Sequence, residues 1–193
     1  MVRFLLLLVL APSLFAATIT VRVRDARGRA VTDAVIYAEP EGRQLPLARR
    51  TAVMDQRNRQ FDPRVLPVQV GTAVSFPNND DVQHHVYSFS KAKKFQLPLY
   101  KGTPANPEIF DRIGVVALGC NIHDQMSAFI VVVDTPYFAK TANGAATLDD
   151  LDAGRYKVKV WHADLGAEPR DVALKSGDSL SLTFDLGRAH ARP

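Results

Sequence analysis

The chain has 193 residues, of which 47% are hydrophobic, and a formal net charge of +4. This composition supports a sizeable core and argues against a disordered protein. The small positive charge, without a helix-turn-helix or zinc-finger pattern, gives no reason to expect a nucleic-acid partner. The length allows one large all-β domain or two small ones.

The chain begins with an apolar segment, MVRFLLLLVLAPSLFAA, at residues 1–17. A positive charge at Arg3, an apolar stretch over 4–10 and a small residue at Ala16 or Ala17 are typical of a secretory signal peptide. We therefore expect export to the periplasm. After cleavage we expect no integral membrane segment, because no later stretch approaches the ~20 apolar residues of a span. An uncleaved anchor is the alternative, since the residues two positions before these alanines are not small.

Alternation of apolar and polar residues dominates the rest of the chain. It is clearest at residues 18–24 (TITVRVR), 155–161 (RYKVKVW) and 180–186 (LSLTFDL), and each of these segments predicts a half-buried strand. Turn signals such as Asn143-Gly144 separate segments of this kind. No segment keeps a helical period over three turns. The sequence therefore predicts an all-β sandwich architecture.

The two flanks of the chain share short alternating strands with glycine turns. Residues 25–40, DARGRAVTDAVIYAEP, resemble the hairpin D-x-x-G-x-x-V-x-x-A-x-[VI] that opens a carboxypeptidase regulatory-like β-sandwich. Residues 144–160, GAATLDDLDAGRYKVKV, resemble the run that closes such a domain. Because these pieces stand far apart in the chain, we expect residues 51–135 to be inserted into the sandwich. The alternative is two unrelated β-hairpin regions that flank one domain.

The middle of the chain contains its one cysteine, Cys120, in the stretch GCNIHDQM. In an exported protein this leaves a buried thiol, an intermolecular disulfide or a metal ligand. His123 and Met126 follow at the spacing C-x2-H-x2-M, and a thiolate, an imidazole and a thioether on one loop suit copper. Zinc is the chief alternative, since thiolate and imidazole bind both metals. The second imidazole would come from His84 or His85 upstream.

The segment before these histidines resembles the cupredoxins, the blue copper proteins of the plastocyanin and amicyanin type. In that family a strand with the pattern F-x-P-x-x-L-x-V-x-x-G-x-x-V-x-F-x-N leads to the first histidine ligand. The matching residues in this chain are Phe61, Pro63, Leu66, Val68, Gly71, Val74, Phe76 and Asn78. The resemblance makes His84 the first ligand, because NNDDVQHHV lines up with N-N-x-x-x-x-H-N-V. His85 replaces the usual asparagine, and we expect its ring to point to the opposite face of the strand.

The resemblance implies one copper ion per chain, cycling between Cu(I) and Cu(II). Cys120 would supply the thiolate, His84 and His123 the imidazoles, and Met126 a weak axial thioether. It implies a carrier of single electrons, not an enzyme, which meets a redox protein partner through the exposed ring of His123. The whole chain also resembles bacterial exported proteins of the methylamine utilisation type.

Two other functions are open: a copper carrier or storage protein, and a structural adhesion module with a decayed site. Met54 and Gln56 share one strand face and could approach the metal, although a role as ordinary strand residues is the default. Four lysines follow the first ligand and could attract an acidic partner, with a solvated face as the default. These are Lys91, Lys93, Lys94 and Lys101.

The expected fold is all-β, a cupredoxin Greek-key β-sandwich inserted into a second, smaller carboxypeptidase regulatory-like or immunoglobulin-like β-sandwich. The signal peptide would span residues 1–17 and the first part of the outer sandwich residues 18–50. The copper domain would span 51–135, and the remainder of the outer sandwich 136–188.

Overall fold

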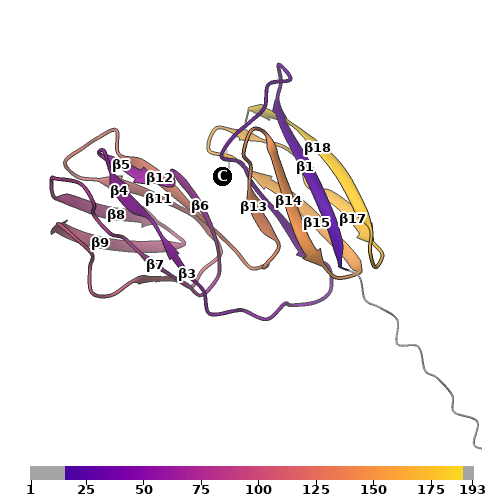
Figure 1. The fold of residues 1–193 in the computed structure, drawn as a ribbon, viewed down its shortest axis with the longest axis horizontal. Coiled ribbons are helices and arrows are strands. Elements are labelled where there is room, and N and C mark those ends of the chain that lie inside the picture. The colour runs from indigo at the N-terminus through magenta and orange to yellow at the C-terminus, as the bar shows by residue number, and fades with distance from the viewer. Residues whose placement is uncertain (1–15, 189–193) are drawn as a thin grey trace, which may run out of the picture.

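The computed structural model describes residues 16–188, and its regular elements are all β-strands. Figure 1 shows two β-sandwiches next to each other, one built from both ends of the chain and one from its middle. This arrangement confirms that one sandwich is inserted into the other. The expected signal peptide lies outside the described residues except for Ala16 and Ala17, and Ala17 already belongs to the first strand. Within residues 16–188 no helix is long and apolar enough to cross a membrane.

The outer sandwich has two four-stranded sheets. The first runs in the order β14 (Ala145–Leu151), β1 (Ala17–Asp25), β18 (Ser179–Arg188) and β16 (Leu165–Gly166). The second runs in the order β13 (Phe138–Lys140), β2 (Val35–Pro40), β15 (Gly154–Trp161) and β17 (Arg170–Leu174). In Figure 1 the indigo β1 lies beside the yellow β18, with which it pairs in parallel.

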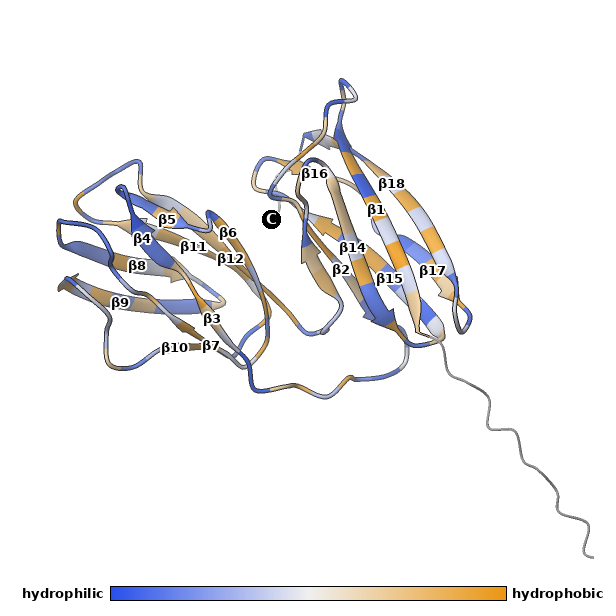
Figure 2. Cartoon of the chain, viewed as in Figure 1, coloured by the Kyte–Doolittle hydropathy of each residue, from blue (hydrophilic) through white to orange (hydrophobic). Residues whose placement is uncertain are grey.

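Alternation along the strands builds the core of this sandwich. Ile19, Val21 and Val23 on β1 are fully buried, while the residues between them face outward. On β18, Phe184 and Leu186 are buried in the same cluster. Figure 2 shows the resulting bands of hydrophobic and hydrophilic residues along both strands. The three segments expected as strands from their alternation fall within β1, β15 and β18, so these predictions are confirmed.

The inserted sandwich contains a five-stranded sheet, a three-stranded sheet and a hairpin. The five strands are, in order, β6 (Val65–Gln69), β12 (Ser127–Val133), β11 (Gly114–Cys120), β8 (His84–Ser90) and β9 (Lys93–Tyr100). The three strands are β10 (Glu108–Phe110), β7 (Thr72–Ser75) and β3 (Thr51–Val53), and the hairpin joins β4 (Asp55–Arg57) to β5 (Gln60–Asp62). We propose residues 51–135 as the bounds of this domain, with the outer sandwich formed by 18–50 and 136–188.

Strand β12 is apolar at almost every position because both of its faces are covered. Ala128, Ile130 and Val132 point into the core of the inserted sandwich. Val131 and Val133 point the other way, into a small cluster shared with the outer sandwich. Both faces of this strand therefore contribute to packing, one within its domain and one between domains.

The shared cluster holds the two sandwiches together. Val35 and Trp161 come from the outer sandwich, and Val65 joins the β12 valines from the inserted one. The rings of Phe129 and Trp161 lie 5.4 Å apart between centroids, and Trp161 is only 6% exposed. The loss of this indole would leave a cavity at the junction of the two domains.

We expect Trp161→Ala to lower the free energy of unfolding by about 3–5 kcal/mol, the usual loss for a buried tryptophan. Guanidinium denaturation measures the change. Phe89→Ala is a suitable control, because Phe89 is 67% exposed, and a surface substitution of this kind stays within about 0.5 kcal/mol. A loss at Trp161 no larger than that of the control would contradict the packing described here.

Candidate metal centre

Three potential metal ligands meet at one end of the inserted sandwich. His84 is the first residue of β8, Cys120 is the last residue of β11, and His123 lies in the loop that follows. The two strands are antiparallel neighbours, with Cys120 opposite Val86. The start of β8 and the end of β11 therefore lie at the same end of the sheet. This explains why side chains 36 positions apart in the chain come together.

The ligand atoms of these residues form a compact triangle. The sulfur of Cys120 lies 3.7 Å from Nδ1 of His84 and 3.9 Å from Nδ1 of His123. All three atoms lie within 4.8 Å of one another. Separations of this size suit atoms that bond one central ion at about 2.0–2.3 Å, the usual lengths for imidazole nitrogen and thiolate.

The three side chains differ in burial. His84 is 0% exposed and Cys120 is 4% exposed, whereas His123 is half-buried. Of the three residues, His123 is therefore the most accessible to water. Ile122, next to His123, is 48% exposed.

The fourth expected ligand, Met126, closes the loop. Its backbone N–H donates to the carbonyl of His123 at 2.9 Å, which makes the loop from Cys120 to β12 a tight turn. Its side chain is 1% exposed and belongs to the same apolar cluster as Cys120. Met126 would supply the thioether from this cluster, and its bond to a metal stays a prediction.

His85 lies outside the triangle. The pairing of β8 with β9 shifts by one residue between His84 and Val86, which is the mark of a β-bulge. His84 and Val86 are buried while His85 is half-buried, as expected for neighbours on opposite faces. The Nε2 atom of His85 is buried without a hydrogen-bond partner in the described part of the chain. The carbonyl of His85, not its ring, accepts the N–H of Asn121 at 3.3 Å and ties the two ligand segments together.

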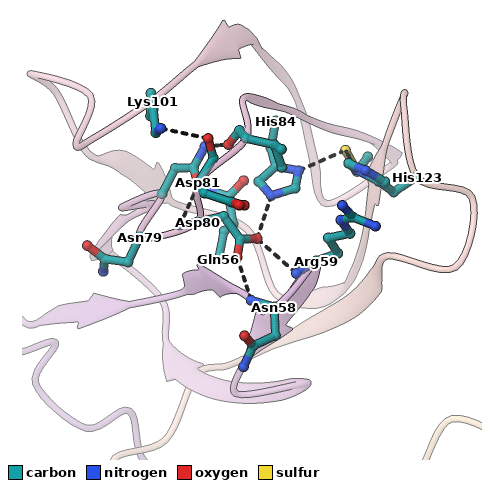
Figure 3. A network of polar contacts seen from close by, with 12 residues as sticks. Gln56, Asn58, Arg59, Asn79, Asp80, Asp81, His84, Lys101 and His123 are labelled. Carbon is teal, nitrogen blue, oxygen red and sulfur yellow. Dashed lines mark hydrogen bonds and ion pairs between the residues drawn. The ribbon is translucent and has the colours of Figure 1, made fainter.

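A carboxylate that the sequence analysis missed lies behind His84. Oδ2 of Asp80 is 2.7 Å from Nε2 of His84 (Figure 3), whereas the sulfur of Cys120 lies near Nδ1 of the same ring. The N–H groups of Asn58 and Arg59 donate to the same carboxylate at 2.6 and 2.8 Å. Burial raises the pKa of Asp80, but the hydrogen bonds from His84, Arg59 and Asn58 outweigh it and hold this pKa below its ordinary value. A carboxylate four residues before the first histidine was the only signal in the sequence.

Met54 and Gln56 have structural roles. Met54 is fully buried in the core of the inserted sandwich. Gln56 is also fully buried, and its amide contacts the hydroxyl of Tyr100 and lies 3.2 Å from the carbonyl of Pro77. The hydroxyl of Tyr100 donates to the carbonyl of Phe76 at 2.7 Å, and burial raises the pKa of Tyr100 to about 12. These bonds fix the segment that precedes Asp80.

Three of the four lysines lie at the wrong end of the domain to guide a partner to this site. β8 runs away from His84, and Lys93 and Lys94 pair with Ser90 and Phe89 at its far end. Six strand steps span about 20 Å, which exceeds the Debye length of about 8 Å at physiological ionic strength. Lys93 is also paired with Glu108 at 3.0 Å. The positions of Lys91, Lys93 and Lys94 therefore favour the default interpretation, a solvated face, over steering of a partner to this site.

Lys101 is the exception among the four. Its Nζ lies 2.6 Å from the carbonyl of Asp81, near the start of β8. This bond holds the lysine at the end of the domain that carries the three potential ligands.

No family model and no curated protein matches this chain. Solved structures similar to it include a purple cupredoxin from Nitrosopumilus maritimus, at 22% identity over 44% of this chain and 99% of that one, with a TM-score of 0.37. The reduced form of a mutant amicyanin is 24% identical over 45% of this chain and 86% of that one, with a TM-score of 0.39. A copper-containing nitrite reductase from Thermus scotoductus SA-01 is 22% identical over 50% of this chain and 26% of that one, with a TM-score of 0.40. The assignment of the metal site therefore depends on the geometry of its own residues and not on these similarities.

We expect His84→Gly to abolish binding of Cu(II) or Co(II) at this site, because it removes one corner of the triangle. His85→Asn should keep one ion per chain, since the ring of His85 lies outside the triangle. Native mass spectrometry of the metal-loaded variants measures both stoichiometries. Equal loss of metal in the two variants would show that the site has been assigned to the wrong histidine.

Proposed function

We propose that this protein is a mononuclear type 1 (blue) copper protein that carries single electrons between redox partners in the periplasm. The observation that carries the proposal is the buried thiol of Cys120 within 4 Å of Nδ1 of both His84 and His123. Two imidazoles and one thiolate, with a weak thioether from Met126, form the donor set that suits copper in blue electron-transfer sites. Bound copper would supply a centre that accepts and releases one electron.

The two buried ligands come from a rigid part of the fold. His84 and Cys120 lie on strands whose ladders continue away from the site, so neither can move without disrupting a sheet. Their burial removes water that could act as an additional ligand. A donor set held in this way keeps one geometry in both oxidation states, and electron transfer then needs little rearrangement.

The half-buried ligand provides the route for the electron. The ring of His123 lies between the thiol and the surface, next to the exposed side chain of Ile122. A partner that docks on this surface would reach the metal through one imidazole, and no substrate would have to enter the site. This favours an electron carrier over an enzyme.

The alternatives differ in how the protein handles the metal. A copper carrier or storage protein would release the ion readily, whereas an electron carrier retains it through each redox cycle. The three converging side chains speak against an adhesion module with a decayed site. Zinc fits the same thiolate and imidazoles, and the thioether of Met126 is the feature that favours copper. Export to the periplasm is proposed from residues 1–17.

We expect the Cu(II) protein to absorb intensely in the visible range, because electron density moves from the thiolate of Cys120 to the metal. Cys120→Ser should remove this band and the narrow copper hyperfine splitting of a blue site. Visible and EPR spectra of both proteins measure the effect. A band that survives in Cys120→Ser, or a wild type that binds Zn(II) but gives no such band with Cu(II), would disprove the proposed function.

We expect Ile122→Lys to slow electron exchange with a small redox protein, such as a c-type cytochrome, about tenfold, within the range of association rates among variants of one interface. The visible spectrum should stay nearly unchanged, because Ile122 is not one of the proposed ligands. Phe89→Lys is the matched control, since Phe89 is exposed at the far end of β8. Stopped-flow mixing measures the rates. Equal rates in the two variants would place the docking surface elsewhere, and transfer of reduced copper to an added chelator in each cycle would favour storage.

A further inference from the structure

The two histidines of the site are held differently. Nδ1 of His84 faces the thiol of Cys120, and its other ring nitrogen, Nε2, lies 2.7 Å from Oδ2 of Asp80. Nδ1 of His123 also faces the thiol. Within residues 16–188 no group hydrogen-bonds the other ring nitrogen of His123. Only the buried histidine therefore has a carboxylate behind it.

The carboxylate of Asp80 is held in place by the fold itself. Its Oδ1 accepts the N–H of Asn58, and its Oδ2 accepts the N–H of Arg59 together with Nε2–H of His84. Asn58 and Arg59 have φ values of 53° and 56°, and this left-handed turn directs both N–H groups at the carboxylate. The N–H of Asp80 donates to Oδ1 of Asn78 at 3.0 Å, and the Asp80 side chain is 8% exposed. Figure 3 shows this network converging on one side of the His84 ring.

No cationic side chain neutralises this carboxylate within residues 16–188. Arg59 contacts Asp80 through its backbone, and its guanidinium extends away from the carboxylate in Figure 3. Arg57 pairs with Asp55 at 3.1 Å. Among the described residues, His84 is the one ion-pair partner of Asp80. The negative charge of Asp80 is therefore directed at a proposed metal ligand.

Resting on the copper site proposed above, we propose that Asp80 is a positioning residue that sets the metal affinity and the reduction potential of the site. By accepting the hydrogen of Nε2, it keeps the lone pair of Nδ1 on His84 turned toward Cys120. It also makes the ring a stronger electron donor, as carboxylates behind metal-binding histidines do. A nearby negative charge stabilises Cu(II) more than Cu(I), because Cu(II) carries the larger positive charge.

The test compares Asp80→Asn with Asp81→Asn in the full chain. Both changes remove one formal negative charge from neighbouring positions, but Asp81 is exposed and contacts Lys101 through its backbone carbonyl. Asparagine at position 80 can still accept the hydrogen of Nε2, so the ring stays supported while the charge is lost. Competition with a chelator measures the Cu(II) affinity, and cyclic voltammetry measures the potential.

We expect Asp80→Asn to weaken Cu(II) binding about 10- to 100-fold, the usual effect of losing a partner behind a metal ligand. If Cu(II) loses tenfold more affinity than Cu(I), the reduction potential rises by about 59 mV for one electron. Asp81→Asn should change the Cu(II) affinity less than threefold and leave the reduction potential nearly unchanged. Equal values for the two variants would overturn the role of Asp80.

Two further measurements test Asp80 independently. The first does not require a blue copper site, and the second does not require a variant that folds. Zn(II) affinities of the two variants test the positioning of His84 even if no blue copper site forms, and equal Zn(II) affinities would also overturn the role of Asp80. Pulsed EPR of the wild-type Cu(II) protein reads the remote nitrogens of both histidines and needs no variant. We expect two different quadrupole couplings, since one remote nitrogen donates to a carboxylate and the other has no hydrogen-bond partner among residues 16–188. A single coupling for both rings would contradict the proposal.

Discussion

The ladder between β8 and β11 is the constraint on which the proposed site depends. Cys120 pairs with Val86 and Gly119 pairs with Tyr87, so the end of one strand meets the start of the other. A Cβ at position 119 would lie 2.7 Å from the ring of Tyr87, which makes glycine necessary for this close approach. A slip of one residue would turn Cys120 to the other face of the sheet. The register of two strands therefore determines whether thiol and imidazole can meet.

The site combines a rigid interior with an accessible edge. Sheet strands hold His84 and Cys120, and a carboxylate anchored to a hairpin turn supports His84 from behind. The short loop that ends at Met126 carries His123 to the surface. The strands thus supply the two buried ligands, and the loop supplies the ligand that lies nearest to a docking partner.

Much of the fold could be predicted from sequence because alternation has a direct physical meaning. Buried residues at every second position of β1 and β18 identify strands whatever their partners are. The spacing of Cys120 and His123 on one loop also suggested a metal site, and the resemblance to the cupredoxins, not spacing, chose His84 over His85. The support from Asp80 could not be predicted, because it needs a left-handed backbone at both Asn58 and Arg59, and arginine, unlike asparagine, does not favour that conformation. The lysines show a second limit: Lys93 and Lys94 follow His84 closely in the chain, but a straight strand carries them to the opposite end of the domain.

The parallel pairing of β1 with β18 also determines the order in which the chain can fold. Thr18 pairs with Ser179, so the first strand of the outer sandwich waits for one of the last to be synthesised. The strands of the inserted sandwich all lie between them and can pair with one another much earlier. Closing the long loop between β1 and β18 costs less conformational entropy once the intervening chain is already compact. The domain that carries the proposed metal ligands is therefore expected to form first, and its folding prepares the closure of the domain around it.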